Sequence, residues 1–163
     1  MKKETAVFAA GCFWGVEELI RKIPGVIETE VGYSGGVSAS EAVYEKVKTG
    51  QTGHAEAIQV TFDSNVLKYE ELIHYFFKLH DPTTLNQQGN DKGSQYRSAV
   101  FYSGFDQKNA VEKVRAEVEQ SGKWKKPIVT EIIPLSGFYS AESYHQDYLQ
   151  KNPGGYTCHF WRH

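Results

Sequence analysis

Segments with the pattern of β-strands alternate with segments with the pattern of helices, and this alternation constrains the fold more than any other feature. Residues 5–10 form a short apolar run, which predicts a buried strand. Val16, Leu19, Ile20 and Ile23 then recur at helical spacing and predict an amphipathic helix. Such alternation favours the α+β class, a two-layer α/β arrangement in which helices pack on a mixed β-sheet.

The rest of the chain continues the alternation. Further strands are expected near residues 26–33, 58–62, 98–103 and 128–133, and further helices near 66–79, 106–122 and 141–150. Asp106 is expected to cap the helix that begins beside it. Ser34-Gly35-Gly36 opens a long polar loop, and residues 151–163 predict an irregular C-terminal tail. No repeat or linker divides the sequence, so we expect a single domain over residues 1–163.

The composition excludes several classes of protein. The chain has 163 residues, of which 40% are hydrophobic and 23% charged, as is typical of soluble globular proteins. A formal net charge of -2 provides no basic surface for nucleic acid. The apolar run near the start is too short for a secretory signal or a membrane span. We therefore expect a cytoplasmic protein that binds neither nucleic acid nor membrane.

Two cysteines are too few for a disulfide-built scaffold, and one of them stands in an unusual motif. In Gly11-Cys12-Phe13-Trp14-Gly15 the predicted strand passes directly into the predicted helix. The free amides and dipole of a first helical turn favour an anion, which predicts a lowered pKa for Cys12. The glycines leave the sulfur approachable, and the aromatic pair suits a small apolar group such as a methyl. The alternative is an inert, buried structural cysteine.

This motif, extended to Val16-Glu17, resembles the signature of the A-type peptide-methionine sulfoxide reductases, which return the S epimer of methionine sulfoxide to methionine. The resemblance covers most of the chain and continues in order through Gly32-Tyr33-Ser34-Gly35-Gly36, Thr52-Gly53-His54-Ala55-Glu56, His80-Asp81-Pro82-Thr83, Gln88-Gly89-Asn90-Asp91, Gln95-Tyr96-Arg97-Ser98, Phe138-Tyr139, Ala141-Glu142, His145-Gln146 and Asn152-Pro153-Gly154-Gly155-Tyr156.

The resemblance implies catalytic roles for four residues. Cys12 corresponds to the nucleophile and Glu56 to the acid that protonates the sulfoxide oxygen, while Tyr44 and Tyr96 correspond to the tyrosines that hydrogen-bond this oxygen. A sulfoxide oxygen leaves poorly unless it is protonated, so burial should raise the pKa of Glu56 and keep the carboxyl neutral near pH 7. For these side chains the alternatives are a solvated carboxylate at a strand end and ordinary core tyrosines.

The resemblance also implies substrate-binding and recycling residues. Phe13 and Trp14 correspond to the pocket for the substrate methyl, and Asp91 to an acidic residue at the edge of the site. Cys12 should become a sulfenic acid, which condenses readily with a second thiol. Cys158 then corresponds to the recycling cysteine, and His159 could raise its thiolate fraction. The alternative is an unused tail cysteine.

The family further implies thioredoxin as the external dithiol, with no bound cofactor or metal, and oxidised proteins and free methionine sulfoxide as substrates. We expect a monomer with a ferredoxin-like core that repairs proteins under oxidative stress. The chain carries no third cysteine, so we expect one recycling disulfide and no relay.

Three rival interpretations remain open at this point. A cysteine hydrolase would pair Cys12 with His54 or His145. A zinc site would use both cysteines and two histidines, but no closely spaced ligand pair is present. A redox sensor on the same fold would need Cys12 but none of the groups that bind oxygen.

Overall fold

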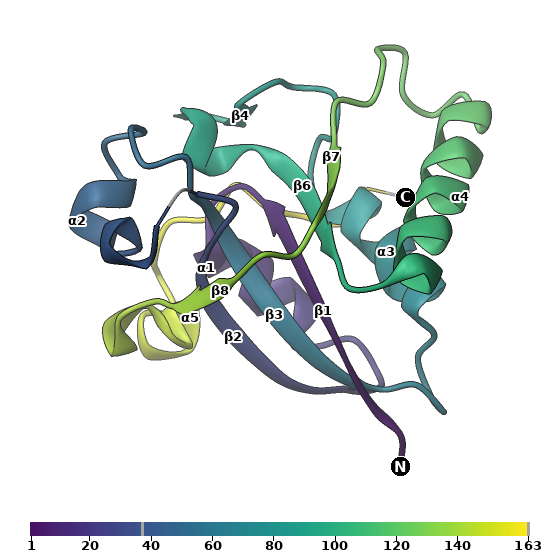
Figure 1. Ribbon diagram of the computed structural model, residues 1–163, viewed down its shortest axis with the longest axis horizontal. Coiled ribbons are helices and arrows are strands. Elements are labelled where there is room, and N and C mark those ends of the chain that lie inside the picture. Colours follow the sequence, from purple (N-terminus) through teal and green to yellow (C-terminus); the bar gives the residue numbers. More distant parts are fainter. Residues whose placement is uncertain (37, 163) are drawn as a thin grey trace.

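A six-stranded sheet lies at the centre of the structure, a computed structural model that describes residues 1–36 and 38–162 (Figure 1). In spatial order its strands are β7 (Glu131–Pro134), β6 (Ser98–Tyr102), β1 (Lys3–Ala10), β3 (Ala55–Asp63), β2 (Val26–Ser34) and β8 (Phe138–Ser140). β6 and β7 run parallel, and the other neighbouring pairs run antiparallel. The predicted mixed sheet is therefore confirmed. Val37 and His163, which belong to the predicted polar loop and tail, lie outside the described residues.

The structure has five α-helices within the described residues: α1 (Phe13–Ile20), α2 (Tyr44–Val47), α3 (Tyr69–Leu79), α4 (Phe105–Gln120) and α5 (Tyr148–Lys151). Short 3-10 turns form at Ala39–Glu41, Ser94–Tyr96 and Ser143–His145. α1 and α3 pack on the sheet, and α4 packs beside α3 (Figure 1). The predicted α+β class, with helices on a mixed sheet, is thus confirmed.

Two predicted helix features are wrong in detail. Asp106 does not cap α4, because the cap is Gly104, whose φ of 86° suits glycine, and Asp106 lies inside the first turn. The single helix expected near 141–150 is split into a 3-10 turn and α5. Asp147 separates these pieces because it adopts a left-handed conformation with φ 55°.

The four central strands follow the chain order β1-α1-β2-β3-α3-β6 and the spatial order β6-β1-β3-β2. The β1–α1–β2 unit is split by β3, which runs antiparallel to both strands. We propose that this arrangement is the expected ferredoxin-like core, on the basis of topology alone.

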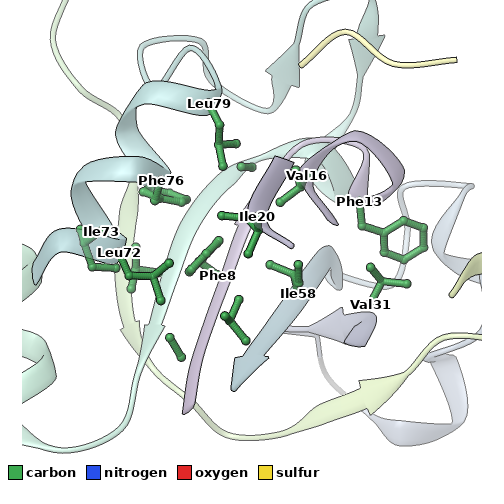
Figure 2. Close-up of a cluster of buried hydrophobic side chains, with 14 of the residues drawn as sticks. Phe8, Phe13, Val16, Ile20, Val31, Ile58, Leu72, Ile73, Phe76 and Leu79 are labelled. Carbon is green, nitrogen blue, oxygen red and sulfur yellow. The ribbon is translucent and has the colours of Figure 1, made fainter. Parts of the chain in front are cut away.

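The main core lies between the sheet and the two helices that pack on it (Figure 2). Phe8 and Ile58 point from the strands toward Ile20 of α1 and Phe76 of α3, and all four side chains are fully buried. Because side chains alternate along a strand, Glu56 points to the same face as Ile58. A carboxyl group therefore lies at the end of an apolar row, where the sheet meets the start of α1.

The opposite face of the sheet is covered differently. The connection between β7 and β8 crosses in front of the central strands (Figure 1). Ile133, Leu135 and Phe138 from this segment pack on a small apolar cluster that includes Val7 and Phe101. The segment between β7 and β8 therefore covers the second face of the sheet, and it contains no helix.

The tail that follows α5 has no helix or strand, as predicted. It passes over the start of α1 and ends against α3. There the Trp161 ring lies edge-on to Tyr75 at a centroid separation of 5.5 Å, and the Arg162 backbone N–H donates to Lys78 O at 2.7 Å. No helix within residues 1–36 and 38–162 is long and apolar enough to cross a membrane.

Candidate active site

The ends of β1, β2 and β3 meet at one edge of the sheet and bring the Cys12 thiol and the Glu56 carboxyl group together. Cys12 follows β1 through Gly11, whose φ of 97° turns the chain sharply into α1. Glu56 is the second residue of β3, and the strand register places it opposite Tyr33 of β2. The backbone N–H of Phe13 donates to Oε1 of Glu56 at 3.2 Å. The carboxyl group is thereby fixed at the first turn of α1, beside the Cys12 thiol.

The Glu56 side chain is only 2% exposed. Burial, together with the nearby charge of Asp91, raises the pKa of Glu56 to about 8, although the Phe13 N–H acts in the opposite direction. The carboxyl group is therefore mainly protonated at pH 7. Because Oε1 accepts the Phe13 N–H, the proton belongs on Oε2, where it is available for donation.

The Cys12 thiol is 7% exposed, and its pKa is raised well above the ordinary range. Burial is the main cause and the nearby Glu56 adds to it, while the Trp14 backbone N–H acts in the opposite direction. The expectation of a lowered pKa is therefore wrong for the substrate-free site. The physical reason is that Cys12 is buried at the first turn of α1 and that the Phe13 N–H already donates to Glu56.

Two tyrosines complete the group around Cys12. Tyr44 begins α2, and Tyr96 ends the 3-10 turn before β6. Burial and the charge of Glu56 raise the pKa of both hydroxyls, and Cys12 contributes in the same direction. Both hydroxyls therefore stay protonated, and neither hydrogen-bonds to another side chain of the described residues. They are free to donate to an oxygen atom placed between them and Glu56.

Glu142 anchors Tyr44, and the sequence identified no role for it. The Tyr44 backbone N–H donates to Oε2 of Glu142 at 2.9 Å, and the Tyr33 hydroxyl donates to Oε1 at 2.8 Å. One carboxylate thus ties the start of α2 to β2. The only sequence signal was its position in the Ala141-Glu142 segment.

Aromatic side chains next to Cys12 form an apolar wall. Phe13 is 1% exposed, and Trp14 stacks on Tyr148 at a centroid separation of 3.8 Å. The Trp14 indole N–H donates to Nδ1 of His145 at 2.9 Å. The His145 ring lies 4.5 Å from the Tyr44 ring and 5.2 Å from the Phe13 ring, centroid to centroid. His145 therefore supports both the wall and a tyrosine.

The protonation state of His145 follows from these contacts. Burial lowers its pKa, so the ring is neutral at pH 7. Because Nδ1 accepts from Trp14, the hydrogen resides on Nε2. The sequence suggested His145 as part of the family resemblance and as a possible hydrolase base, and no signal singled out Tyr148 among ten tyrosines.

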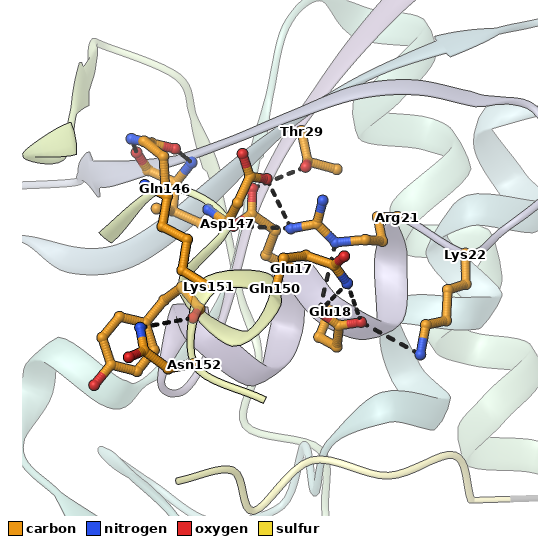
Figure 3. A network of polar contacts seen from close by, with 12 residues as sticks. Glu17, Glu18, Arg21, Lys22, Thr29, Gln146, Asp147, Gln150, Lys151 and Asn152 are labelled. Atoms are coloured by element: carbon orange, nitrogen blue, oxygen red, sulfur yellow. Dashed lines mark hydrogen bonds and ion pairs between the residues drawn. The ribbon is translucent and has the colours of Figure 1, made fainter. Parts of the chain in front are cut away.

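A polar network fixes the segment that carries His145 to α1 (Figure 3). Glu17 is 1% exposed, and its carboxylate accepts hydrogen bonds from the Asp147 backbone N–H and the Thr29 hydroxyl, both at 2.8 Å. Arg21 pairs with Asp147 at 2.8 Å. The helix that carries Trp14 and the turn that carries its acceptor are therefore held as one unit.

Asp91 lies on a two-stranded hairpin that the sequence did not predict, formed by β4 (Gln87–Gln88) and β5 (Asp91–Lys92). The Tyr156 hydroxyl of the tail donates to Oδ2 of Asp91 at 3.2 Å. Burial raises the pKa of Asp91, while this hydrogen bond opposes the shift. The hairpin therefore forms a second edge of the site and holds the tail against it.

Cys158 is half-buried, and both cysteines are free thiols. A Cβ at Gly15 would collide with Thr157 Oγ1 and would lie 2.6 Å from His159 Nδ1. The residues on both sides of Cys158 therefore rest on the first turn of α1, close to Cys12. The tail brings the two cysteines into one neighbourhood.

His159 does not play the expected electrostatic role. Its Nε2 hydrogen-bonds to Ala10 O at 2.6 Å, and burial lowers its pKa to about 4. The ring is therefore neutral at pH 7 and cannot stabilise a Cys158 thiolate by positive charge. The expectation that His159 raises the thiolate fraction is wrong because the imidazole is used to fasten the tail to β1.

Comparison with known proteins agrees with this site. Residues 4–163 match the family model "PMSR: Peptide methionine sulfoxide reductase". The chain belongs to the peptide methionine sulfoxide reductase family. The predicted family and enzyme class are therefore confirmed.

Known members of the peptide methionine sulfoxide reductase family resemble the chain along nearly its whole length. A relative from Mesorhizobium japonicum, named peptide methionine sulfoxide reductase MsrA 1, is 52% identical over 159 residues, which cover 98% of this chain and 90% of the relative. The crystal structure of reduced Mxr1 from Saccharomyces cerevisiae has a TM-score of 0.92 and 40% identity, over 99% of this chain and 93% of that one. Mxr1 in complex with Trx2 matches with a TM-score of 0.66 and 27% identity, over 99% and 91%.

The geometry and the family together disfavour a cysteine hydrolase. His54 accepts the Gly36 backbone N–H at Nδ1 (3.0 Å), and its Nε2 pairs with Ser38 O at 2.8 Å. His145 accepts the Trp14 indole N–H at Nδ1.

The zinc interpretation finds no matching group of ligands. In the part of the chain that the structure describes, no three His, Cys, Asp or Glu side chains are grouped to hold a metal ion.

Proposed function

We propose that this chain reduces the S epimer of methionine sulfoxide, in oxidised proteins and as the free amino acid, with Cys12 as the nucleophile. The observation that supports this most strongly is the pair formed by a buried thiol and a neutral acid. Glu56 is held by the Phe13 N–H, and its pKa of about 8 supplies a proton at pH 7. A structural cysteine would not need such a neighbour.

The remaining groups suit a sulfoxide. Its methyl would lie against Phe13 and Trp14, and its oxygen would accept hydrogen bonds from Tyr44 and Tyr96 as negative charge develops. Asp91, at the open edge of the site, would contact the rest of the substrate. These side chains come from one chain, which supports catalysis by a monomer.

The first half-reaction moves one oxygen atom and two electrons. The Cys12 sulfur bonds to the substrate sulfur while the Glu56 Oε2 proton passes to the sulfoxide oxygen. The bond between the two sulfurs then breaks as the oxygen passes from the substrate sulfur to the Cys12 sulfur, so the sulfoxide is reduced to methionine and Cys12 is oxidised to a sulfenic acid. The proton of the Cys12 thiol returns to Glu56, because the two buried groups are neighbours.

The second half-reaction would restore Cys12. The Cys158 sulfur attacks the sulfenic sulfur, the S–S bond forms, and the S–OH bond breaks as the proton of the Cys158 thiol passes to the departing hydroxyl, which leaves as water. An external dithiol, thioredoxin, would then reduce the disulfide by exchange. The structural neighbour Mxr1, solved in complex with Trx2, supports a protein reductant. A cytoplasmic location and a role in protein repair belong to this proposal, since the cycle needs reduced thiols.

A single-turnover experiment tests the proposal. Reduced protein is mixed, without added reductant, with a peptide that carries either the S or the R epimer of methionine sulfoxide. We expect about one methionine per chain from the S epimer, none from the R epimer, and a Cys12–Cys158 disulfide in the product. Cys158→Ser should keep the burst and accumulate the sulfenic acid. Folded protein with a free Cys12 that forms no methionine would refute the proposal.

A further inference from the structure

Tyr156 connects the hairpin to the recycling cysteine, and neither the sequence motif nor the proposed first half-reaction gives it a role. It stands two residues before Cys158, and its side chain is 43% exposed. Its hydroxyl donates to Oδ2 of Asp91 at 3.2 Å, across 65 residues of sequence. Such a long-range contact holds the tail at a defined place on β5.

The same hairpin receives the Cys158 sulfur. The thiol donates weakly to Gln88 O at 3.9 Å, and a Cβ at Gly89 would lie 3.3 Å from the sulfur. Gln88 and Asp91 are paired across the hairpin, so the Cys158 sulfur and the Tyr156 hydroxyl lie against two paired residues. The hydroxyl is bonded to a carboxylate, and the sulfur of Cys158 is the second acceptor on the same hairpin.

A tyrosine hydroxyl has only one hydrogen, so it cannot donate fully to both acceptors. While Cys158 is a thiol, its S–H has two acceptors at 3.9 Å, Gln88 O and His159 Nδ1, and the Tyr156 hydroxyl donates to Asp91. Once Cys158 loses its proton, the sulfur becomes the stronger acceptor. The hydroxyl can then turn from Asp91 to the thiolate while the tail stays in place.

Few groups around Cys158 stabilise its thiolate, so the Tyr156 hydroxyl is an important donor. Burial raises the pKa of Cys158 and the charge of Asp91 adds to it, whereas the Tyr156 hydroxyl and Arg162 lower it. Cys12 is a buried thiol, and His159 is neutral and bonded to Ala10 O. Arg162 lies at the far end of the tail, where its guanidinium covers the Phe160 ring at 3.9 Å.

We propose that Tyr156 is a positioning residue for recycling, whose hydroxyl moves from Asp91 to the Cys158 sulfur as that sulfur attacks the Cys12 sulfenic acid. This inference rests on the proposed function. In the step, the S–S bond forms and the S–OH bond breaks, Cys158 is oxidised and the sulfenic sulfur of Cys12 is reduced, and the proton of the Cys158 thiol passes to the departing hydroxyl, which leaves as water. The Tyr156 proton is only shared and returns to Asp91 when the disulfide is complete.

Tyr156→Phe tests the inference, because it keeps the ring and removes only the donor. The variant is mixed with one equivalent of the S-epimer peptide without reductant, and methionine formation and thiol loss are followed separately at pH 6 to 10. We expect an unchanged methionine burst, disulfide formation slower by roughly tenfold near pH 7, and a pH profile of this second step displaced to higher pH.

Tyr102→Phe is the matched control, since it removes a tyrosine hydroxyl from β6 away from the tail, and both of its steps should equal those of the unmodified protein. An unchanged rate and pH profile of disulfide formation in Tyr156→Phe would overturn the inference. A loss of rate without a displaced pH profile would also overturn it, because a purely structural defect has that signature. Absence of the methionine burst in the unmodified protein would instead refute the proposed function.

Discussion

The side chain of Glu56 accepts a hydrogen bond from the backbone N–H of Phe13, so an acid from β3 occupies one of the free amides at the start of α1. The thiol of Cys12, one residue earlier, therefore shares the helix terminus with a carboxyl group. The carboxyl is mainly neutral and the thiol is mainly protonated in the substrate-free site. The protonation of Glu56 is the basis of the first two predictions.

Glu56→Gln should slow the methionine burst by about 10²- to 10⁴-fold, because the amide cannot supply a proton to the sulfoxide oxygen. In the unmodified protein the acidic form is lost as pH rises through about 8, so the burst rate should fall above that pH. This fall should be absent from the residual activity of the variant. A burst rate that is unaffected by the substitution would remove Glu56 from the mechanism.

The same carboxyl should make stability depend on pH. Its pKa rises on folding from the reference value of 4.5 to about 8, so the folded state holds a proton that the unfolded state releases. The resulting stabilisation is fully present below pH 4.5 and is lost as pH rises through about 8, by on the order of a few kcal/mol. Urea unfolding at pH 5 and pH 8.5 should show a smaller difference for Glu56→Gln than for the unmodified protein. Glu28→Gln, on an exposed strand position, is the control and should behave like the parent.

Gly15→Ala should separate the two half-reactions. The added methyl would collide with Thr157 Oγ1 and lie 2.6 Å from His159 Nδ1, so the tail must lift from α1. We expect a retained methionine burst and at least tenfold slower disulfide formation, measured by mass spectrometry of quenched samples. Gly154→Ala, where no atom lies within 4 Å of the added methyl, should leave both steps intact. Equal disulfide rates in the two variants would contradict the contact between the tail and α1.

His145→Phe should weaken substrate binding, because it removes the acceptor that orients the Trp14 indole. An unpaired, partly buried N–H costs about 1–3 kcal/mol, so Trp14 should turn away from its stacked position on Tyr148. We expect a higher KM for the peptide and altered Trp fluorescence. His145→Asn, whose side-chain oxygen can replace Nδ1, should restore much of the loss. If both variants bind the peptide like the parent, the Trp14–His145 contact does not shape the pocket.

The sequence predicted the elements that carry a strong apolar pattern. The apolar run in β1 reflects burial on both faces of the sheet, whereas the alternation in β3 and the helical spacing in α1 and α3 reflect burial on one face; these elements form the core. The hairpin β4–β5 and the strand β8 were missed because each is two or three residues long and carries no periodicity. Asp147 has a left-handed conformation that no local pattern announces, so the break before α5 was missed as well.

The electrostatics of the candidate site were predicted only in part, because burial raises the pKa of Glu56 as expected. Helix position alone suggested a lowered pKa for Cys12, whereas burial and Glu56 raise it. Sequence cannot show that the Phe13 amide is taken by a carboxyl 43 residues away. The supporting groups, Glu142 and Tyr148, were missed for the same reason, since their roles depend on contacts between distant segments.

The attachment of the tail to the core determines how the protein loses activity when it is heated. Segments without regular secondary structure open at lower free energy than the core, so amide hydrogen exchange should reach residues 156–161 long before β1 or β3. Mild heating would then detach Cys158 while Cys12 and Glu56 keep their geometry. The molecule would become a reagent that repairs one substrate and stops, and its loss of turnover would precede its loss of fold.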